Sequence, residues 1–212
     1  MHAHAAIVSE CSLMCRYGMR DGSVTRGLIQ RAALELFVAK GVGETTVRDL
    51  ARAAGIAEGT LYRHYASMDA LVWELFSANY AVFARRLEAA QLGRVGFSAR
   101  LAAVVGEFCR LFDAEPVLFR FLMLVQHQAL PRVANDADNP VELVHRLVDE
   151  AMERGEIDRL PPGLAASMVL GLLLQPAFGL VYGRLAPPFS QYADAISAAC
   201  ERALGARESH DE

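Results

Sequence analysis

The side chains that could carry out chemistry are few and lie far apart in the chain. His127 and His145 are isolated, and we interpret each as a polar residue on a helix face rather than a catalytic base. The sequence has no glycine-rich phosphate loop, no nucleophile with a matched base and no HExxH pair. We therefore predict that the protein is not an enzyme and needs no cofactor.

The cysteines do not form a pattern typical of a secreted protein. They are Cys11, Cys15, Cys109 and Cys200, the last two on apolar helical stretches. This distribution favours a reduced, cytoplasmic compartment. A metal site built from His2, His4, Cys11 and Cys15 is conceivable, but the spacing matches no zinc pattern. We prefer to interpret this segment as a disordered extension and predict no metal.

Residues 47–65, VRDLARAAGIAEGTLYRHY, have the spacing of a helix-turn-helix. Such a motif needs a small residue where two helices cross, a turn glycine and apolar residues on the facing surfaces. Ala51 and Gly55 meet the first two needs, and Leu50, Ile56 and Leu61 meet the third. His64 stands where an apolar residue is usual, so we expect the adjacent Tyr65 to pack instead. An ordinary helical hairpin is the alternative.

Helical periodicity and capping signals extend over the whole chain and predict an all-α fold. We expect Thr46 and Asp49 to form a capping box, and Ser67 to cap the long fourth helix. Pro176 should bend or open the eighth helix. The predicted helices are 25–40, 47–54, 58–64, 68–90, 97–113, 116–130, 140–154, 164–185 and 190–204, with a loop at 131–138.

The expected organisation is a small head on a larger body. We assign residues 1–22 to an extension, 23–68 to the helix-turn-helix head, 69–205 to a helical bundle and 206–212 to a frayed tail. Residues 24–68 carry six basic and four acidic groups, a net charge of +2, whereas the whole chain carries −4. Since residues 1–23 balance, residues 69–212 carry −6. A mildly basic segment on a larger acidic body is typical of a protein whose small basic domain contacts DNA.

Residues 161–183 contain no charge, and a stretch of that length could span a bilayer. Glycine, proline, serine and glutamine interrupt it, so we favour a core helix buried on two sides. The first 18 residues lack the long apolar core of a signal peptide. Met14 or Met19 could be the true start.

The run FVAKGVGETTVRDLARAAGIAEGTLYRHYASMDAL resembles the DNA-binding head of the TetR family. The resemblance covers Thr25 to Phe76, and its most specific part is Gly59 to Tyr62. It implies a bacterial-type regulator that binds a DNA operator as a homodimer, with a variable helical domain for a small-molecule effector. The rest of the chain shares only the family's architecture.

The resemblance also implies roles for individual residues. Thr46, Arg48, Tyr62 and His64 would contact backbone phosphates. The third helix would enter the major groove and bring to the base edges Ala57, Glu58, Gly59, Thr60 and Arg63. Arg63 could contact a guanine and Glu58 a cytosine amino group.

Three departures from the family pattern bear on DNA affinity. Glu58 and Met68 stand where the family often has lysine, and Ala57 replaces a common serine that would cap the third helix. Two lost positive contacts per subunit would lower sequence-independent affinity. The alternative hypothesis is therefore a dimeric small-molecule-binding protein that has largely lost DNA binding.

The body should hold an apolar ligand pocket and a dimer interface. We expect the pocket to be lined by Phe108, Phe112, Phe119, Met123, His127, Gln175, Phe178 and Tyr182. We expect a four-helix dimer interface to use Leu164, Met168, Leu172, Tyr192, Ile196 and Ala199. The leading prediction is a cytoplasmic repressor released from a near-palindromic operator by a small, largely apolar molecule.

Overall fold

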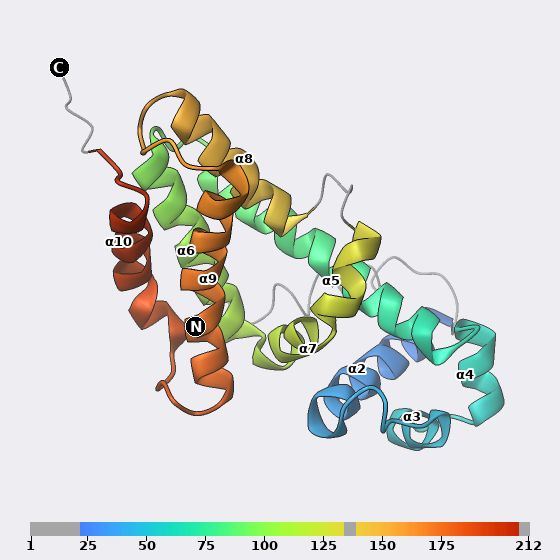
Figure 1. The fold of residues 1–212 in the computed structure, drawn as a ribbon. Helices are drawn as coiled ribbons and strands as arrows, with labels where there is room; N and C mark the ends of the chain where they lie inside the picture. The colour runs from blue at the N-terminus through green and yellow to red at the C-terminus, as the bar shows by residue number, and fades with distance from the viewer. Residues whose placement is uncertain (1–21, 134–138, 208–212) are drawn as a thin grey trace. The chain divides into compact units, whose positions relative to one another are not determined.

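The computed structural model describes residues 22–133 and 139–207, and within these ranges the chain is helical with no strand (Figure 1). This confirms the all-α class and the head with three helices. Residues 1–21 of the expected extension, with the candidate metal ligands, lie outside the described residues, and Gly22 already belongs to the first helix. The helices are α2 (Gly22–Lys40), α3 (Val47–Ala54), α4 (Glu58–His64), α5 (Met68–Gln91), α6 (Phe97–Ala114), α7 (Pro116–Val133), α8 (Pro140–Glu153), α9 (Pro162–Val181), the 3-10 turn η1 (Phe189–Tyr192) and α10 (Ala193–Ala203).

The helices form two compact units. Among the described residues, the first unit contains 22–78 and 114–132, and the second contains 79–113, Val133 and 139–207. Helix α5 contributes to both units. The division differs from the boundary expected at residue 68, because α7 belongs to the same unit as α2, α3 and α4.

Local signals set the ends of the head helices. Thr46 caps α3: its hydroxyl accepts a hydrogen bond from the Asp49 amide, and the Asp49 carboxylate accepts one from the Thr46 amide. Gly55 ends α3 in the left-handed conformation, with φ of 68°. The Ser67 hydroxyl accepts from the amide of Ala70 in the first turn of α5. These three predictions are confirmed, and α4 covers the predicted residues.

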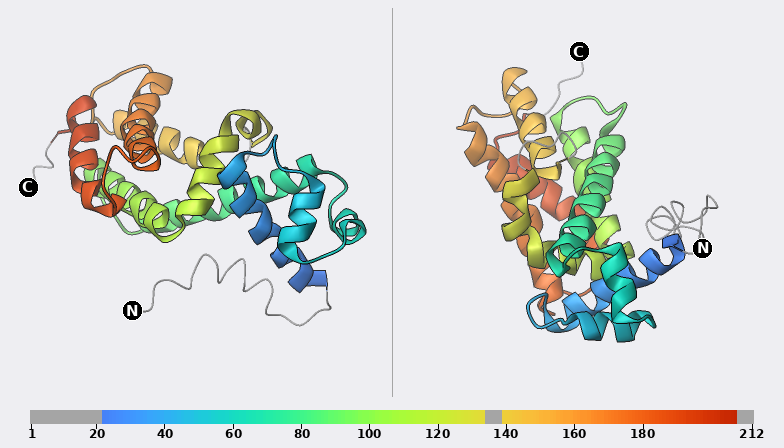
Figure 2. Two further views of the ribbon diagram at one scale, coloured as in Figure 1. Left: turned by 90° about the horizontal axis from the view of Figure 1, so that it is seen from below. Right: turned by 90° about the vertical axis from the view of Figure 1, so that its right-hand side faces the viewer.

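The core of the first unit contains a side chain from α7. The rings of Phe37 on α2 and Phe121 on α7 stack with their centroids 5.8 Å apart, and both side chains are fully buried. Ile29, Leu50 and Leu61 are buried in the same unit. The two views of Figure 2 show α2 beside α3 and α4. The core of the first unit therefore includes a residue that lies far along the sequence from the helix-turn-helix.

The second unit packs around Phe189. Its ring lies 6.0 Å from that of Phe108 and 5.2 Å from that of Phe112. Asp113 at the end of α6 accepts hydrogen bonds from the amides of Phe189 and Ser190, at 2.5 and 2.8 Å. This contact fixes the segment that leads from α9 into α10.

The bounds of the later helices differ from the predicted ones. Helix α7 continues to Val133, so the loop expected from Pro131 is wrong at its start. A proline this close to a helix end removes only one backbone hydrogen bond. Helix α9 ends at Val181 rather than Leu185, since Gly183 turns the chain with φ of 68°. A 3-10 turn precedes α10 where a single helix from Ser190 was expected.

Helix α9 is apolar on the side that the chain covers and on the side that it leaves open. By length and composition alone, Gly163–Val181 could cross a membrane, a test that the core helix of a soluble protein also passes. Only 28% of its apolar window is buried. Ala165, Val169 and Leu173 are buried, whereas Leu164 is half exposed. The single chain therefore buries α9 on one side and leaves open the side of Leu164, an expected dimer contact.

The stacked pair in the first unit gives a stability prediction. Phe121→Ala should lower the free energy of unfolding by about 3–5 kcal/mol, because it leaves a cavity beside Phe37. Leu124→Ala on the same helix is the control, since Leu124 is 57% exposed, and it should cost no more than about 0.5 kcal/mol. Urea denaturation at one fixed protein concentration compares the two. Equal losses would contradict this description of the core.

Candidate nucleic-acid interface

Helices α3 and α4 form the predicted helix-turn-helix (Figure 1). Gly55 reverses the chain between them, and its amide bonds to the carbonyl of Arg52 at 3.2 Å. Ala51 and Leu61 are buried as expected, while Ile56 is only half-buried. Tyr65 is 3% exposed and packs inward, as predicted from the polar character of His64.

The outward surface of the motif is open to solvent. We use the name outer face for the candidate DNA contacts on α3 and α4. Thr60 and His64 are half-buried, and the others are exposed: Thr46, Arg48, Ala57, Glu58, Gly59, Tyr62 and Arg63. Seven of the nine predicted contacts are therefore exposed to solvent, and the other two are partly exposed.

Thr46 is both the N-cap of α3 and a predicted phosphate contact. Its hydroxyl donates to the Asp49 carboxylate at 2.7 Å while it accepts from the Asp49 amide. Lys40 also pairs with Asp49, and this contact and the bonds from Thr46 hold the pKa of Asp49 well below its usual range. A Thr46→Ala substitution would therefore cost about 1 kcal/mol of capping energy in addition to any DNA contact.

Side chains on the outer face also contact one another. The Arg63 guanidinium donates to the Thr60 hydroxyl at 3.0 Å, within α4. Arg48 on α3 and Glu58 on α4 form an ion pair with Nε and Oε1 3.7 Å apart. Ala57 provides no side-chain cap to α4, as we predicted because alanine stands where the family commonly has serine.

A polar cluster that the sequence did not reveal lies behind the outer face. The Tyr65 hydroxyl donates to Glu74 at 3.2 Å and accepts from Gln30 at 3.2 Å. Arg26 pairs with the same carboxylate, and its guanidinium lies 5.1 Å from the centre of the Tyr65 ring. The cluster joins α2, the end of α4 and α5. No local pattern links these residues, because they are up to 48 positions apart.

The predicted pocket residues are divided between the two units. Phe108 and Phe112 contact Phe189 inside the second unit, whereas Phe119 and Met123 are buried in the first. Phe178 stacks on Tyr182 with centroids 6.2 Å apart. Gln175 on α9 and Tyr182, the residue after its last turn, are both exposed. The side chain of His127 lies outside the described part of the chain.

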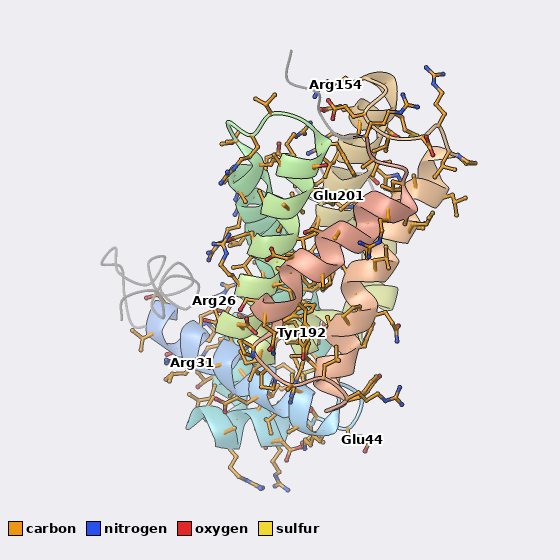
Figure 3. All side chains as sticks on the ribbon, turned by 90° about the vertical axis from the view of Figure 1, so that its left-hand side faces the viewer. Arg26, Arg31, Glu44, Arg154, Tyr192 and Glu201 are labelled. Atoms are coloured by element: carbon orange, nitrogen blue, oxygen red, sulfur yellow. The ribbon has the colours of Figure 1, made fainter. Side chains whose placement is uncertain are left out.

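The predicted dimer residues occupy α9 and the region of α10, which lie side by side (Figure 3). Leu164 is half exposed, and Met168, Leu172, Tyr192 and Ala199 are half-buried. Ile196 is 6% exposed, so it packs inside the second unit and has little surface left for a partner.

Comparison with known proteins agrees with this geometry. Residues 29–75 match the family model of bacterial regulatory proteins of the tetR family. The regulator MftR of Mycobacterium tuberculosis is 48% identical over 62 residues, which are 29% of this chain and 31% of MftR. The transcriptional regulator SrpR of Pseudomonas putida is 28% identical over 178 residues, 80% of this chain and 79% of SrpR.

The fold also has a solved counterpart over most of the chain. The crystal structure of FadR from Bacillus subtilis, in complex with stearoyl-CoA, has a TM-score of 0.69 at 19% identity. The match covers 82% of this chain and 96% of FadR. At this identity the likeness concerns the fold alone.

The helix-turn-helix of α3 and α4, together with the likeness to curated regulators, identifies a DNA-binding transcriptional regulator, a class of protein that is not an enzyme. The head of this chain is that of the tetR family of bacterial regulatory proteins.

The polar cluster gives a pH prediction. Burial and the nearby Glu74 carboxylate raise the pKa of Tyr65 from 10 to about 12. In the unfolded chain this phenol ionises near pH 10, so the stability that the neutral Tyr65 contributes is present below pH 10 and is lost as the pH rises towards 12. Tyr65→Phe keeps the ring but cannot ionise.

We expect wild type to exceed Tyr65→Phe in stability by about 1 kcal/mol at pH 8, and the difference to narrow from pH 10 upward. Chemical denaturation of both proteins over this pH range measures it. A constant difference would contradict the shifted pKa.

Proposed function

We propose that the protein is a ligand-responsive repressor that binds a near-palindromic operator as a homodimer. The observation that carries this proposal is the exposed outer face, which includes residues before and after the turn at Gly55 and presents seven of its residues to solvent. A major groove admits an α-helix of this kind. Two such heads about one DNA turn apart would contact two half-sites.

We assign the contacts of the outer face by chemistry. Tyr62 and Arg48 would bind phosphates, which position the head without reading sequence. Arg63 would bind the O6 and N7 atoms of a guanine, the commonest base-specific contact of arginine. Its hydrogen bond to Thr60 restricts the guanidinium in the free protein, which lowers the entropy lost on binding.

Homodimerisation is proposed from the uncovered side of α9. An apolar helix side that is exposed to water is unfavourable, because burying it against another surface would lower the free energy. The open side includes Leu164, with Met168 and Leu172 partly accessible along the same helix. A second copy related by a twofold axis would place α9 against its own counterpart. A covered α9 also needs no membrane, which fits a cytoplasmic protein.

An apolar effector is proposed from the aromatic side chains of the second unit. Phe108, Phe112 and Phe178 supply the kind of surface that lines small-molecule sites. FadR of Bacillus subtilis, which has the same fold, was crystallised with stearoyl-CoA. A ligand that binds one conformation more tightly than the other shifts the protein toward that conformation. It can lower operator affinity by no more than the ratio of its own affinities for the two conformations.

The second candidate function is a dimeric ligand-binding protein with little DNA affinity, and Glu58 is the residue that favours it. Glu58 places a carboxylate on the outer face, and Met68 at the start of α5 carries no charge. If this candidate holds, the Glu58→Lys, Met68→Lys double variant would bind DNA strongly whereas wild type would not.

Fluorescence anisotropy with DNA that flanks the gene tests DNA binding directly. Arg63→Ala should weaken specific binding on the order of tenfold or more. Arg154→Ala is the matched control: it removes the same charge from the exposed end of α8 (Figure 3) and should leave binding unchanged. Absence of specific binding by wild type at low salt would refute the operator proposal.

A pair of leucine substitutions tests the dimer. Leu164→Arg should raise the dimer dissociation constant on the order of tenfold or more, because it buries an unpaired charge in an apolar interface. Leu92→Arg is the control, since Leu92 is 71% exposed in the turn after α5, and its dimer should be unaffected. Sedimentation velocity over a range of concentrations measures both. Equal behaviour of the two variants would count against α9 as the interface.

A further inference from the structure

The outer face carries an ion pair that joins its two helices. Arg48 comes from the first turn of α3 and Glu58 from the start of α4, and their Nε and Oε1 atoms lie 3.7 Å apart. The two side chains are 78% and 53% exposed. Neither is held by the core, so both are available to a molecule that binds the outer face.

The charge of Glu58 is a problem for any protein that approaches DNA. The phosphates repel a carboxylate, and a carboxylate in a groove loses hydration unless a donor replaces the water. Arg48 offsets that charge from the neighbouring helix. Its guanidinium has five N–H donors, and the contact with Glu58 is made through Nε, which leaves the terminal groups for a phosphate.

Base chemistry limits what the carboxylate can bind. Guanine presents only acceptors in the major groove, and thymine presents an acceptor and a methyl group. Adenine offers an amino group beside the acceptor N7, whose lone pair would repel the second carboxylate oxygen. Cytosine offers the N4 amino group with no acceptor beside it on the same base.

We propose that Glu58 specifies one cytosine in each operator half-site, and that Arg48 makes this possible by bridging the Glu58 carboxylate and a backbone phosphate. The inference rests on the proposed operator binding. On this basis Glu58 determines specificity, and the lysine usual in the family at this position would contribute affinity without that base preference.

The test begins by selecting bound DNA from a random library with the full-length protein. Every base pair of the selected half-site is then varied, and binding is measured for wild type and Glu58→Gln. Wild type should prefer cytosine at one position by on the order of tenfold per half-site. Glu58→Gln should lose the preference for cytosine at that position and keep those at all others.

A double-mutant cycle tests the bridge. Arg48→Ala should reduce operator affinity several-fold more in wild type than in Glu58→Gln, because the carboxylate is left uncompensated only in wild type. Arg52→Ala is the control. Arg52 is exposed one turn further along α3 and forms no ion pair with any residue in the described ranges, so its effect should be equal in both backgrounds. Thermal melting verifies that each variant is folded.

The outcomes separate this inference from the proposed function. If an operator is selected but the base profile of Glu58→Gln equals that of wild type, or if the effects of Arg48→Ala and Glu58→Gln are additive, the inference is overturned and operator binding stands. If wild type selects no DNA, the proposed function fails and the inference fails with it.

Discussion

A helix of seven residues is too short to be stable in isolation, so α4 exists because the rest of the head holds it. Leu61 packs the inner side of α4 into the core, with 1% of its surface exposed. The turn at Gly55 fixes its start, and the Tyr65 amide closes its end on the carbonyl of Leu61 at 3.0 Å. Because one side of α4 is fully used for packing, the other side is free for DNA.

Charge pairing within the head shapes how it can bind. Three of its six basic side chains pair with carboxylates: Arg26 with Glu74, Lys40 with Asp49, and Arg48 with Glu58. Arg31, Arg52 and Arg63 form no ion pair with the residues that the structure describes. Few unpaired cations mean a small sequence-independent contribution to affinity. Under the proposed operator binding, base contacts such as those proposed for Arg63 and Glu58 would supply a larger share of the free energy of binding.

The packing of α7 against α2 ties the stability of the head to a helix outside it. Phe121 stacks on Phe37 in the core of the first unit, so any displacement of α7 changes the surroundings of α2. The head is therefore not stabilised by its own segment alone. At the far end of α7, Arg132 lies 3.8 Å from the centre of the Trp73 ring and pairs with Asp69 at 3.7 Å, which also ties α7 to the start of α5. Close-packed contacts of this kind respond to small shifts.

The sequence by itself determined the features that depend on residues within about four positions of one another. The capping box at Thr46, the turn at Gly55, the cap at Ser67 and the extent of α4 are all of this kind, since backbone and nearby side chains decide them. Tertiary structure alone decided the stacking of Phe121 on Phe37, the cluster around Glu74 and the inward position of Ile196. These depend on which helix faces meet, and residues tens of positions apart leave no local signal of their meeting.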